Sequence, residues 1–287
     1  MKTWLITGAS SGLGRVMTEK LLARGDQVAS TARRADALDD LRSRYPDRLH
    51  VVTLDVTDTE AVRREVASAF AALGRIDVIV SNAGYGLFGA AEELSDAQID
   101  RQIATNLVGS IQLLRASVPF LREQGGGRFM QVSSEGGQTT YPNFSIYHAT
   151  KWGIEGFIEA VAQEVAPFGI DFVIVEPGPT GTAFGANLDQ ADPSAVYDVT
   201  PSGDLRRLLT SGAFALTGDA EKTVDAMIAA GDSDRPPLRL ALTSTTYRNI
   251  SQALAARISA LQAQKLLAFS ADADGKPGLT SGGSSNG

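Results

Sequence analysis

The sequence predicts an α/β protein built on a doubly wound parallel sheet of about seven strands, with helices on both faces. Two observations predict it. Short apolar segments alternate with longer segments of helical period along the whole chain, and most of the short segments are continuously apolar, as parallel strands covered on both faces are. The predicted strands are residues 3–7, 27–31, 49–56, 77–81, 128–133, 171–176 and 238–243.

Three helices are marked most clearly. Ser95-Asp96-Ala97-Gln98 has the form of a capping box and is followed by an apolar stripe of helical period that runs to Leu114. A second stripe fills residues 147–166, and that helix should end near Pro167 and Gly169. A last helix is expected over about 244–268.

The sequence shows neither an internal repeat nor a linker, so we expect one domain over residues 1–269. The segment 183–217 is rich in Gly, Ala, Asp, Pro and Thr. It has the composition of a long loop with short helices, which we expect to cover the active site. The tail 270–287 ends in SGGSSNG and is expected to be flexible.

Composition excludes several classes of function. The net charge of −7 argues against nucleic acid as a partner, because phosphate binding needs a basic face. The lack of cysteine excludes disulfides, zinc–thiolate sites and thiol catalysis, and with two histidines no metal site is expected. We see no targeting signal and no apolar run of about 18 residues, so the expected location is the cytoplasm, without a membrane partner.

The segment TGASSGLG, residues 7–14, predicts a dinucleotide site. It follows the first strand and opens a helix. Glycine lets the backbone turn sharply and approach a diphosphate, and the helix N-terminus offers N–H groups to the phosphates. The alternative is an ordinary flexible turn between strand and helix. The predicted cofactor contacts here are Gly8, Ser10, Ser11, Gly12, Leu13 and Gly14.

The end of the second strand favours NADP(H) over NAD(H). An acidic residue at this place usually holds the ribose 2′-hydroxyl of NAD, but here Ala32 is followed by Arg33 and Arg34. A guanidinium binds a 2′-phosphate through forked, charge-assisted hydrogen bonds. The alternative is that both arginines are solvated residues at a helix start, which fits Arg34 better than Arg33.

Two further strand ends are expected at the adenosine half of the cofactor. Asp55 and Val56, after the third strand, would flank the adenine. The small residues Asn82, Ala83 and Gly84, after the fourth strand, would allow close passage beside the ribose.

Four polar residues then follow in order: Asn106, Ser134, Tyr147 and Lys151. With TGASSGLG before them and PGPTGT (177–182) after them, the chain resembles the single-domain, Rossmann-type short-chain dehydrogenase/reductase family over about residues 3–183, and more loosely to about 243. YHATKWGIEGF and VEPGPTGTAF look closest to a branch that includes 17β-hydroxysteroid-dehydrogenase-like enzymes. The sequence departs from the family at Ser81, where many members have asparagine.

The resemblance implies a role for each of the four residues. Tyr147 is the general acid that protonates the carbonyl oxygen in reduction and the base in oxidation. Lys151 binds the nicotinamide ribose and lowers the tyrosine pKa. Ser134 holds the substrate oxygen, and Asn106 anchors a water that relays protons to Lys151.

The resemblance also places the segment after the sixth strand near the nicotinamide and its carboxamide. The residues concerned are Pro177, Gly178, Thr180 and Thr182. His148, next to Tyr147, points about 100° away on the helix and is expected to be structural.

The spacing of Tyr147 and Lys151 puts both on one face of a helix, an arrangement that is ordinary on solvated surfaces. In an active site it has a further use. Bringing a tyrosine from a pKa of about 10 to near 7 takes roughly 4 kcal/mol of preference for the phenolate. An ammonium about 4 Å away, in a medium of effective dielectric constant about 20, supplies roughly that much. A positively charged nicotinamide would add to it.

The sequence therefore predicts an NADP(H)-dependent carbonyl reductase or secondary alcohol dehydrogenase. Its partner would be a small-molecule ketone or secondary alcohol, and the family resemblance implies a homodimer or homotetramer. Two alternatives stay open: a catalytically silent NADP-binding sensor or regulator on the same fold, and an epimerase or dehydratase that uses the same Tyr/Lys pair. The glycine spacing and the shorter chain disfavour the second.

Overall fold

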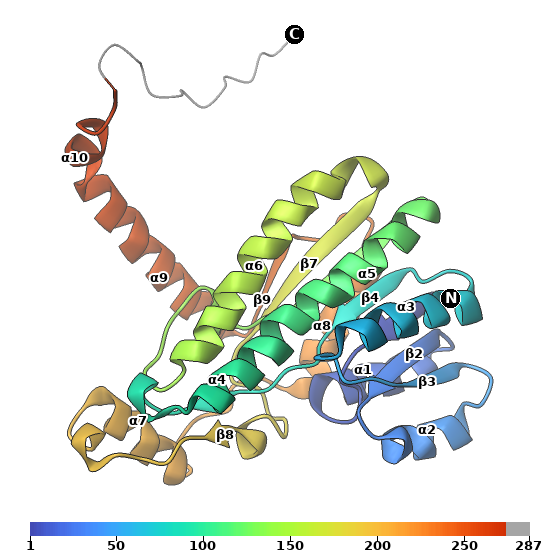
Figure 1. Cartoon of the computed structure of the whole chain (residues 1–287), viewed down its shortest axis with the longest axis horizontal. Coiled ribbons are helices and arrows are strands. Elements are labelled where there is room, and N and C mark those ends of the chain that lie inside the picture. Colours follow the sequence, from blue (N-terminus) through green and yellow to red (C-terminus); the bar gives the residue numbers. More distant parts are fainter. Residues whose placement is uncertain (274–287) are drawn as a thin grey trace.

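The computed structural model describes residues 1–273, and its centre is a parallel sheet of seven strands in the order β3-β2-β1-β4-β6-β7-β9 (Figure 1). The predicted fold class is confirmed, and each predicted strand is found with its ends within three residues of the expected ones. Of the predicted tail, residues 274–287 lie outside the described part of the chain. The strands are β1 (Thr3–Ile6), β2 (Gln27–Ala32), β3 (Leu49–Thr53), β4 (Val78–Ser81), β6 (Gly127–Val132), β7 (Ile170–Pro177) and β9 (Arg239–Leu242).

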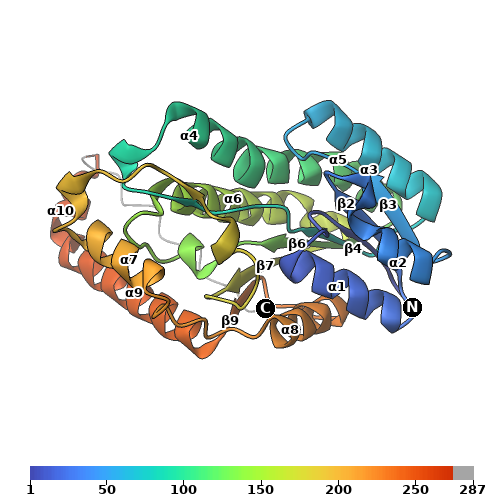
Figure 2. The ribbon, with the colours of Figure 1, turned by 90° about the horizontal axis from the view of Figure 1, so that it is seen from below.

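Two layers of helices enclose the sheet, as the view from below shows (Figure 2). Helices α1, α2 and α8 pack on one face, and α3, α5 and α6 pack on the other. Alternate strand residues supply the two cores, so that Trp4 and Ile6 face the first layer while Leu5 faces the second. The helices are α1 (Gly12–Ala23), α2 (Asp39–Arg44), α3 (Thr59–Leu73), α4 (Asp96–Ile103), α5 (Gly109–Glu123), α6 (Ser145–Val165), α7 (Pro201–Thr210), α8 (Ala220–Asp232), α9 (Ser244–Ala263) and α10 (Lys265–Phe269).

The local signals in the sequence give the helix ends. The capping box forms at Ser95, whose hydroxyl accepts from the Gln98 N–H while the Gln98 side chain accepts from the Ser95 N–H. Helix α6 ends at Val165, and Gly169 takes a left-handed conformation with φ of 68°. The stripe from 99 to 114 does not form one regular helix, because a π-helical turn at Ala104–Val108 separates α4 from α5.

The order of the strands reverses at β1, whose neighbours are β2 and β4. In doubly wound sheets, ligands bind in the crevice at the carboxyl ends of the strands at this point. The turn after β1 and the segments after β4, β6 and β7 therefore meet at one edge of the sheet.

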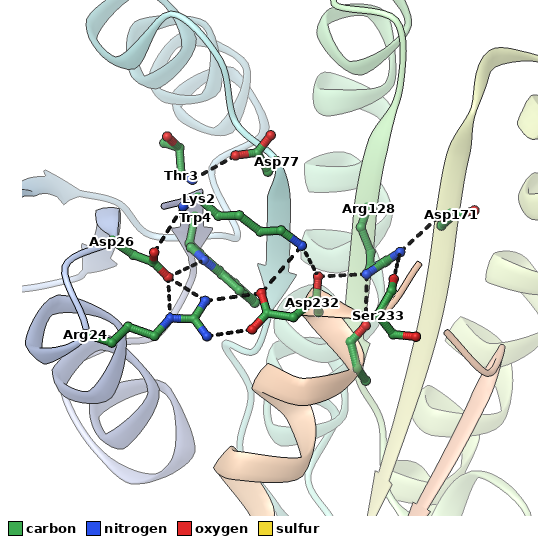
Figure 3. A network of polar contacts seen from close by, with 12 residues as sticks. Lys2, Thr3, Trp4, Arg24, Asp26, Asp77, Arg128, Asp171, Asp232 and Ser233 are labelled. Atoms are coloured by element: carbon green, nitrogen blue, oxygen red, sulfur yellow. Dashed lines mark hydrogen bonds and ion pairs between the residues drawn. The ribbon is translucent and has the colours of Figure 1, made fainter. Parts of the chain in front are cut away.

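At the other end of the sheet, where the strands begin, a network of ion pairs and hydrogen bonds joins the strands to the helices (Figure 3). The buried Arg128 at the start of β6 donates to the backbone oxygens of Gly231 and Ser233 at the end of α8, and to Asp171 on β7. Asp26 accepts from the indole N–H of Trp4 at 3.2 Å. These contacts fix α8 to the strands at the end away from the predicted site.

The segment after β7 is attached to the body at several points. Its short strand β8 (Asp189–Gln190) pairs in parallel with β5 (Leu87–Phe88). Arg206 on α7 donates from Nη2 to both carboxylate oxygens of the buried Glu93, each at 2.9 Å. Residues 183–217, the covering segment from here on, are thus held against the region that follows β4.

Helices α9 and α10, residues 244–269, leave the body as an arm (Figure 1). We call them the C-terminal arm. Thr246 and Ile250 in its first turns are buried, but beyond Ile250 every arm side chain except Ala253 is exposed. Within residues 1–273, the helices lack the combination of length and apolar character that crossing a bilayer requires.

Candidate active site

The glycine-rich turn is shaped by the strand beside it. Gly8 has φ of 69°, and a Cβ there would lie 2.8 Å from the Ala83 Cα. The Asn82 amide donates to the carbonyl oxygens of Thr7 and Gly8, at 2.9 and 3.1 Å. In return, the Thr7 hydroxyl accepts from the backbone N–H groups of Asn82 and Ala83. Asn82 and Ala83, predicted as ribose contacts, therefore brace the turn, and Thr7 is a bracing residue that sequence reasoning missed.

The start of α1 is packed so closely against the glycine turn that only glycine fits at position 14. Gly12 also has positive φ, and a Cβ on Gly14 would lie 2.6 Å from the Gly8 oxygen. Ser10 and Ser11 are exposed, and Leu13 packs partly against the core. The first N–H groups of a helix have no partner within it, so this cradle of glycines in front of α1 fits a dinucleotide diphosphate.

The end of β2 carries the charge expected for a 2′-phosphate. Ala32 is buried, and the two arginines after it are exposed. Hydrogen bonds from the Thr57 backbone and hydroxyl lower the pKa of Asp55 at the end of β3, and the Arg33 charge adds to this lowering. Arg34 lies 3.6 Å from Asp36 instead. The Arg33 charge therefore acts on Asp55, and a contact of Arg33 with a 2′-phosphate stays a prediction. Val56 packs against Gly109.

The structure brings three of the four predicted catalytic residues together. Ser134 follows β6, and its hydroxyl accepts from the Gly136 N–H at 3.0 Å. Tyr147 and Lys151 lie one turn apart on α6. The Lys151 Nζ is 5.5 Å from the centre of the Tyr147 ring and donates to the backbone oxygen of Val132, at 3.0 Å.

Titration behaviour departs from the expectation for the pair. Burial raises the pKa of Tyr147 to about 12, although its hydrogen bond with Ser134 opposes the rise. The direction is opposite to the one expected from Lys151, whose amine is drawn to the Val132 oxygen. Burial also lowers the pKa of Lys151 to about 8, and the Glu155 carboxylate opposes that shift. In the protein without a cofactor, desolvation is therefore the main cause of the pKa shifts of both Tyr147 and Lys151.

Asn106 lies in the π-helical turn between α4 and α5 and is buried. Its Oδ1 accepts from the Tyr85 N–H at 3.1 Å, and its Nδ2 donates to the Tyr85 oxygen at 2.8 Å. The side chain thus holds the segment after β4, next to Gly84, where a Cβ would lie 3.1 Å from its Oδ1. A water relay through Asn106 stays a prediction.

The segment after β7 contacts both the glycine turn and Tyr147. The Thr180 hydroxyl donates to the Gly178 oxygen, and a Cβ on Gly12 would lie 3.8 Å from the Thr182 Cβ. Thr182 therefore lies against the glycine turn, whereas Gly178 packs against Thr243 and Thr246 at the start of α9. In the covering segment, the Phe184 ring lies 5.8 Å from that of Tyr147.

His148 has the structural role predicted for it. Its Nδ1 donates to the Gly136 oxygen at 2.8 Å, and its Nε2 accepts from the Tyr141 N–H at 2.9 Å. Both ring nitrogens therefore hold the backbone of the segment that follows Ser134.

A second polar group behind Ser134 was missed from the sequence. The Tyr141 hydroxyl donates to Glu135 at 2.6 Å, and Asn249 on α9 donates to both of them at 3.1 and 3.2 Å. Burial, reinforced by the Glu135 carboxylate, raises the pKa of Tyr141 to about 12. No sequence signal links Glu135 with a residue 114 positions later.

Comparison with known proteins agrees with this geometry. The family model described as short chain dehydrogenase matches residues 2–193. A short-chain dehydrogenase structure from Streptomyces avermitilis superposes with a TM-score of 0.86 at 39% identity, covering 94% of this chain and 98% of that one.

Two curated relatives are similar in sequence. Oxidoreductase BOA17 of Botryotinia fuckeliana is 36% identical over 241 residues, 83% of this chain and 88% of that protein. A 3-ketodihydrosphingosine reductase of Bacteroides thetaiotaomicron is 35% identical over 198 residues, 66% of this chain and 71% of that protein. The chain therefore belongs to the short-chain dehydrogenase family of oxidoreductases.

Proposed function

We propose that this oxidoreductase transfers hydride between NADP(H) and a ketone/secondary alcohol pair. The observation that carries the proposal is the meeting of Ser134, Tyr147 and Lys151 at the edge of the sheet that holds the glycine cradle. The name of the Bacteroides thetaiotaomicron relative, a ketone reductase, supports the substrate class. Oxidation of NADPH on addition of ketone, measured over aliphatic, aromatic and steroidal ketones, tests it.

The chain's own residues supply everything but the hydride, which is the nicotinamide's chemistry. In reduction, the Ser134 hydroxyl donates to the carbonyl oxygen and orients it. The Tyr147 hydroxyl then gives its proton to that oxygen, and the nearby Lys151 ammonium stabilises the phenolate.

Arg33→Ala is expected to raise the KM for NADPH by roughly 10- to 150-fold and to leave the KM for NADH nearly unchanged. A charge-assisted hydrogen bond contributes about 1.5–3 kcal/mol, and only NADPH carries the 2′-phosphate. Arg34→Ala is the matched control, since Arg34 lies beside Asp36 and should change neither value much. Steady-state kinetics with both cofactors measure this, and an unchanged NADPH KM in the Arg33 variant would refute the assignment.

Family members are typically oligomeric, and we propose that two copies associate here through the C-terminal arm. Tyr247, Leu254, Ile258 and Leu261 lie on one face of α9 and are all exposed. Residues 244–269 contain three basic and no acidic side chains, in a chain of net charge −7. Helices in proteins draw most of their stability from packing an amphipathic face against another surface, so such a contact would stabilise the arm.

In the proposed dimer, the C-terminal arm of one copy contacts the covering segment of the other copy. Val196 and Val199 are exposed there, 64% and 94%, and Asp192, Asp198 and Asp204 are exposed between and beside them. An apolar, acidic surface complements an apolar, basic arm.

Ile258→Glu is expected to shift the protein from dimer or tetramer toward monomer, because it puts a charge into the apolar stripe. Gln252→Glu adds the same charge on the opposite face and should leave the oligomer intact. Light scattering after size exclusion measures the mass. Because the chain has no cysteine, Ile258→Cys mixed with Val199→Cys tests the pairing by disulfide formation between copies. A monomeric wild type, or cross-linking only between two copies of the Ile258→Cys variant, would contradict it.

A further inference from the structure

Glu155 is a buried carboxylate directly behind the proposed proton-transfer pair. It lies one turn after Lys151 on α6, and 2% of its surface is exposed. The Ser133 hydroxyl donates to its Oε1 at 2.5 Å, and Arg239 on β9 donates to its Oε2 at 2.6 Å. Burial raises the pKa of Glu155, and the hydrogen bonds from Arg239 and Ser133 oppose this rise. A buried charge needs a charged partner, and Arg239 supplies one.

The turn that carries Ser134 is built around this carboxylate. A Cβ on Gly137 would overlap the Glu155 side chain, so the turn closes over it only with glycine at that position. Ser133, bonded to Glu155, lies between Val132, whose oxygen accepts from Lys151, and Ser134. The Glu155 carboxylate thus anchors residues 132–134. This stretch fixes the position of the Lys151 ammonium, through the Val132 oxygen, and carries the Ser134 hydroxyl.

Building on the proposed function, we propose that Glu155 is a positioning residue for proton transfer. It fixes Ser133, and through Ser133 the placement of Ser134 relative to Lys151. Its negative charge also acts on the two groups that exchange the proton. Glu155 does not touch the reacting atoms, and it was not marked as functional by the sequence.

The charges around Glu155 come from four elements. Arg239 also contacts Glu176 on β7, at 2.5 Å, and Glu159 on α6, at 2.9 Å from its Nε. Lys151 lies on the preceding turn of α6, and Glu135 lies on the turn after β6. Three carboxylates therefore share one guanidinium, and of the three it is the charge of Glu155 that acts on Lys151.

The sign of the electrostatic effect follows from this arrangement. Burial is the main cause that raises the pKa of Tyr147, and the charges of Glu135 and Glu155 raise it further. The charge of Glu155 also raises the pKa of Lys151 against burial. Neutralising Glu155 should therefore lower the pKa of both groups and make the phenolate easier to form.

Glu155→Gln keeps the shape of the side chain and removes its charge. The tyrosine-dependent limb of the kcat/KM profile for alcohol oxidation is expected to move to lower pH by about one unit, the effect of a unit charge at about 12 Å in an effective dielectric constant of about 20. We also expect kcat to fall by up to about 10²-fold, the order that a misplacement of about 1 Å can cost.

Glu176→Gln is the matched control. Glu176 is buried and bonded to the same Arg239, but it does not contact Ser133. Its removal should disturb the Arg239 cluster equally and leave the pH limb in place. Ser133→Ala is the complementary variant, because it removes the hydrogen bond and keeps the charge. It should lower kcat without moving the limb, and melting curves verify that each variant folds.

The proposal would be overturned if the tyrosine-dependent limb of the kcat/KM profile lay at the same pH in Glu155→Gln and in the wild type. It would also be overturned if Glu176→Gln moved this limb as far as Glu155→Gln does. The proposed function fails separately, if no ketone or alcohol supports turnover. In that case the ultraviolet absorbance of the phenolate, titrated with NADP⁺ present and corrected with Tyr147→Phe, reports the tyrosine pKa directly. The proposal requires this pKa to be lower in Glu155→Gln than in the wild type, and an equal value would refute it.

Discussion

Tyr147→Phe is expected to lower kcat for ketone reduction by about 10²- to 10⁴-fold, the usual contribution of a positioned general acid. The substitution removes only the hydroxyl. The ring still packs between Phe144 and Phe184, at 5.9 and 5.8 Å, so the fold and the KM for NADPH should change little. Single-turnover and steady-state rates of NADPH oxidation give both quantities.

Tyr141→Phe is the control that separates catalysis from the loss of a buried hydroxyl. Burial is the largest cause that raises the pKa of both tyrosines to about 12, but the Tyr141 hydroxyl binds Glu135 and not the region of Lys151. Its loss removes one buried hydrogen bond, which costs about 1–3 kcal/mol of stability and should reduce kcat tenfold at most. If wild type and Tyr147→Phe were equally slow over the whole ketone panel, the sensor alternative would replace the enzyme.

Gly8→Ala is expected to destabilise the protein and to weaken NADPH binding at least tenfold. The residue has φ of 69°, where alanine is strained by about 1–2 kcal/mol. In addition, the new Cβ would lie 2.8 Å from the Ala83 Cα, so the turn must move away from the segment that follows β4. Denaturant unfolding gives the stability, and fluorescence titration with NADPH gives the Kd.

Gly74→Ala also places alanine at positive φ, but without the clash. Its φ is 73°, and within residues 1–273 no atom beyond Gly74 and its two chain neighbours lies within 4 Å of the place that the new methyl group would take. It should cost about 1–2 kcal/mol in stability and leave the Kd for NADPH unchanged. Equal effects of the two substitutions on the Kd would show that the close approach of Gly8 to Ala83 has no part in binding.

Features that depend on neighbouring residues were predictable from the sequence. Apolar runs gave the seven strands, the Ser95 capping box gave the start of α4, and Gly169 gave the end of the helical segment that contains Tyr147. The glycine turn and the pair on α6 were also found, because short-range spacing determines which side chains share a turn or a helix face.

Features that depend on contacts between residues far apart in the sequence were not predictable from the sequence. The interruption of the stripe at Asn106 follows from its two bonds with Tyr85, which the periodicity of apolar residues does not record. The rise of the Tyr147 pKa in the protein alone was not foreseen, because burial emerges only after packing. The lowering expected beside Lys151 and a bound cofactor stays a prediction. Glu155 looked like one more glutamate on a helix, since its partner Arg239 is 84 residues away.

The base of the C-terminal arm affects the order in which the enzyme matures during synthesis. The ribosome delivers the glycine turn first and the Tyr147 helix midway, yet the turn behind Ser134 receives Asn249 only after the last strand has been made. Gly178 likewise packs against Thr246 of this late helix. In a nascent chain, the segments that carry Glu135 and Gly178 therefore gain these contacts only after the last strand of the sheet has been made.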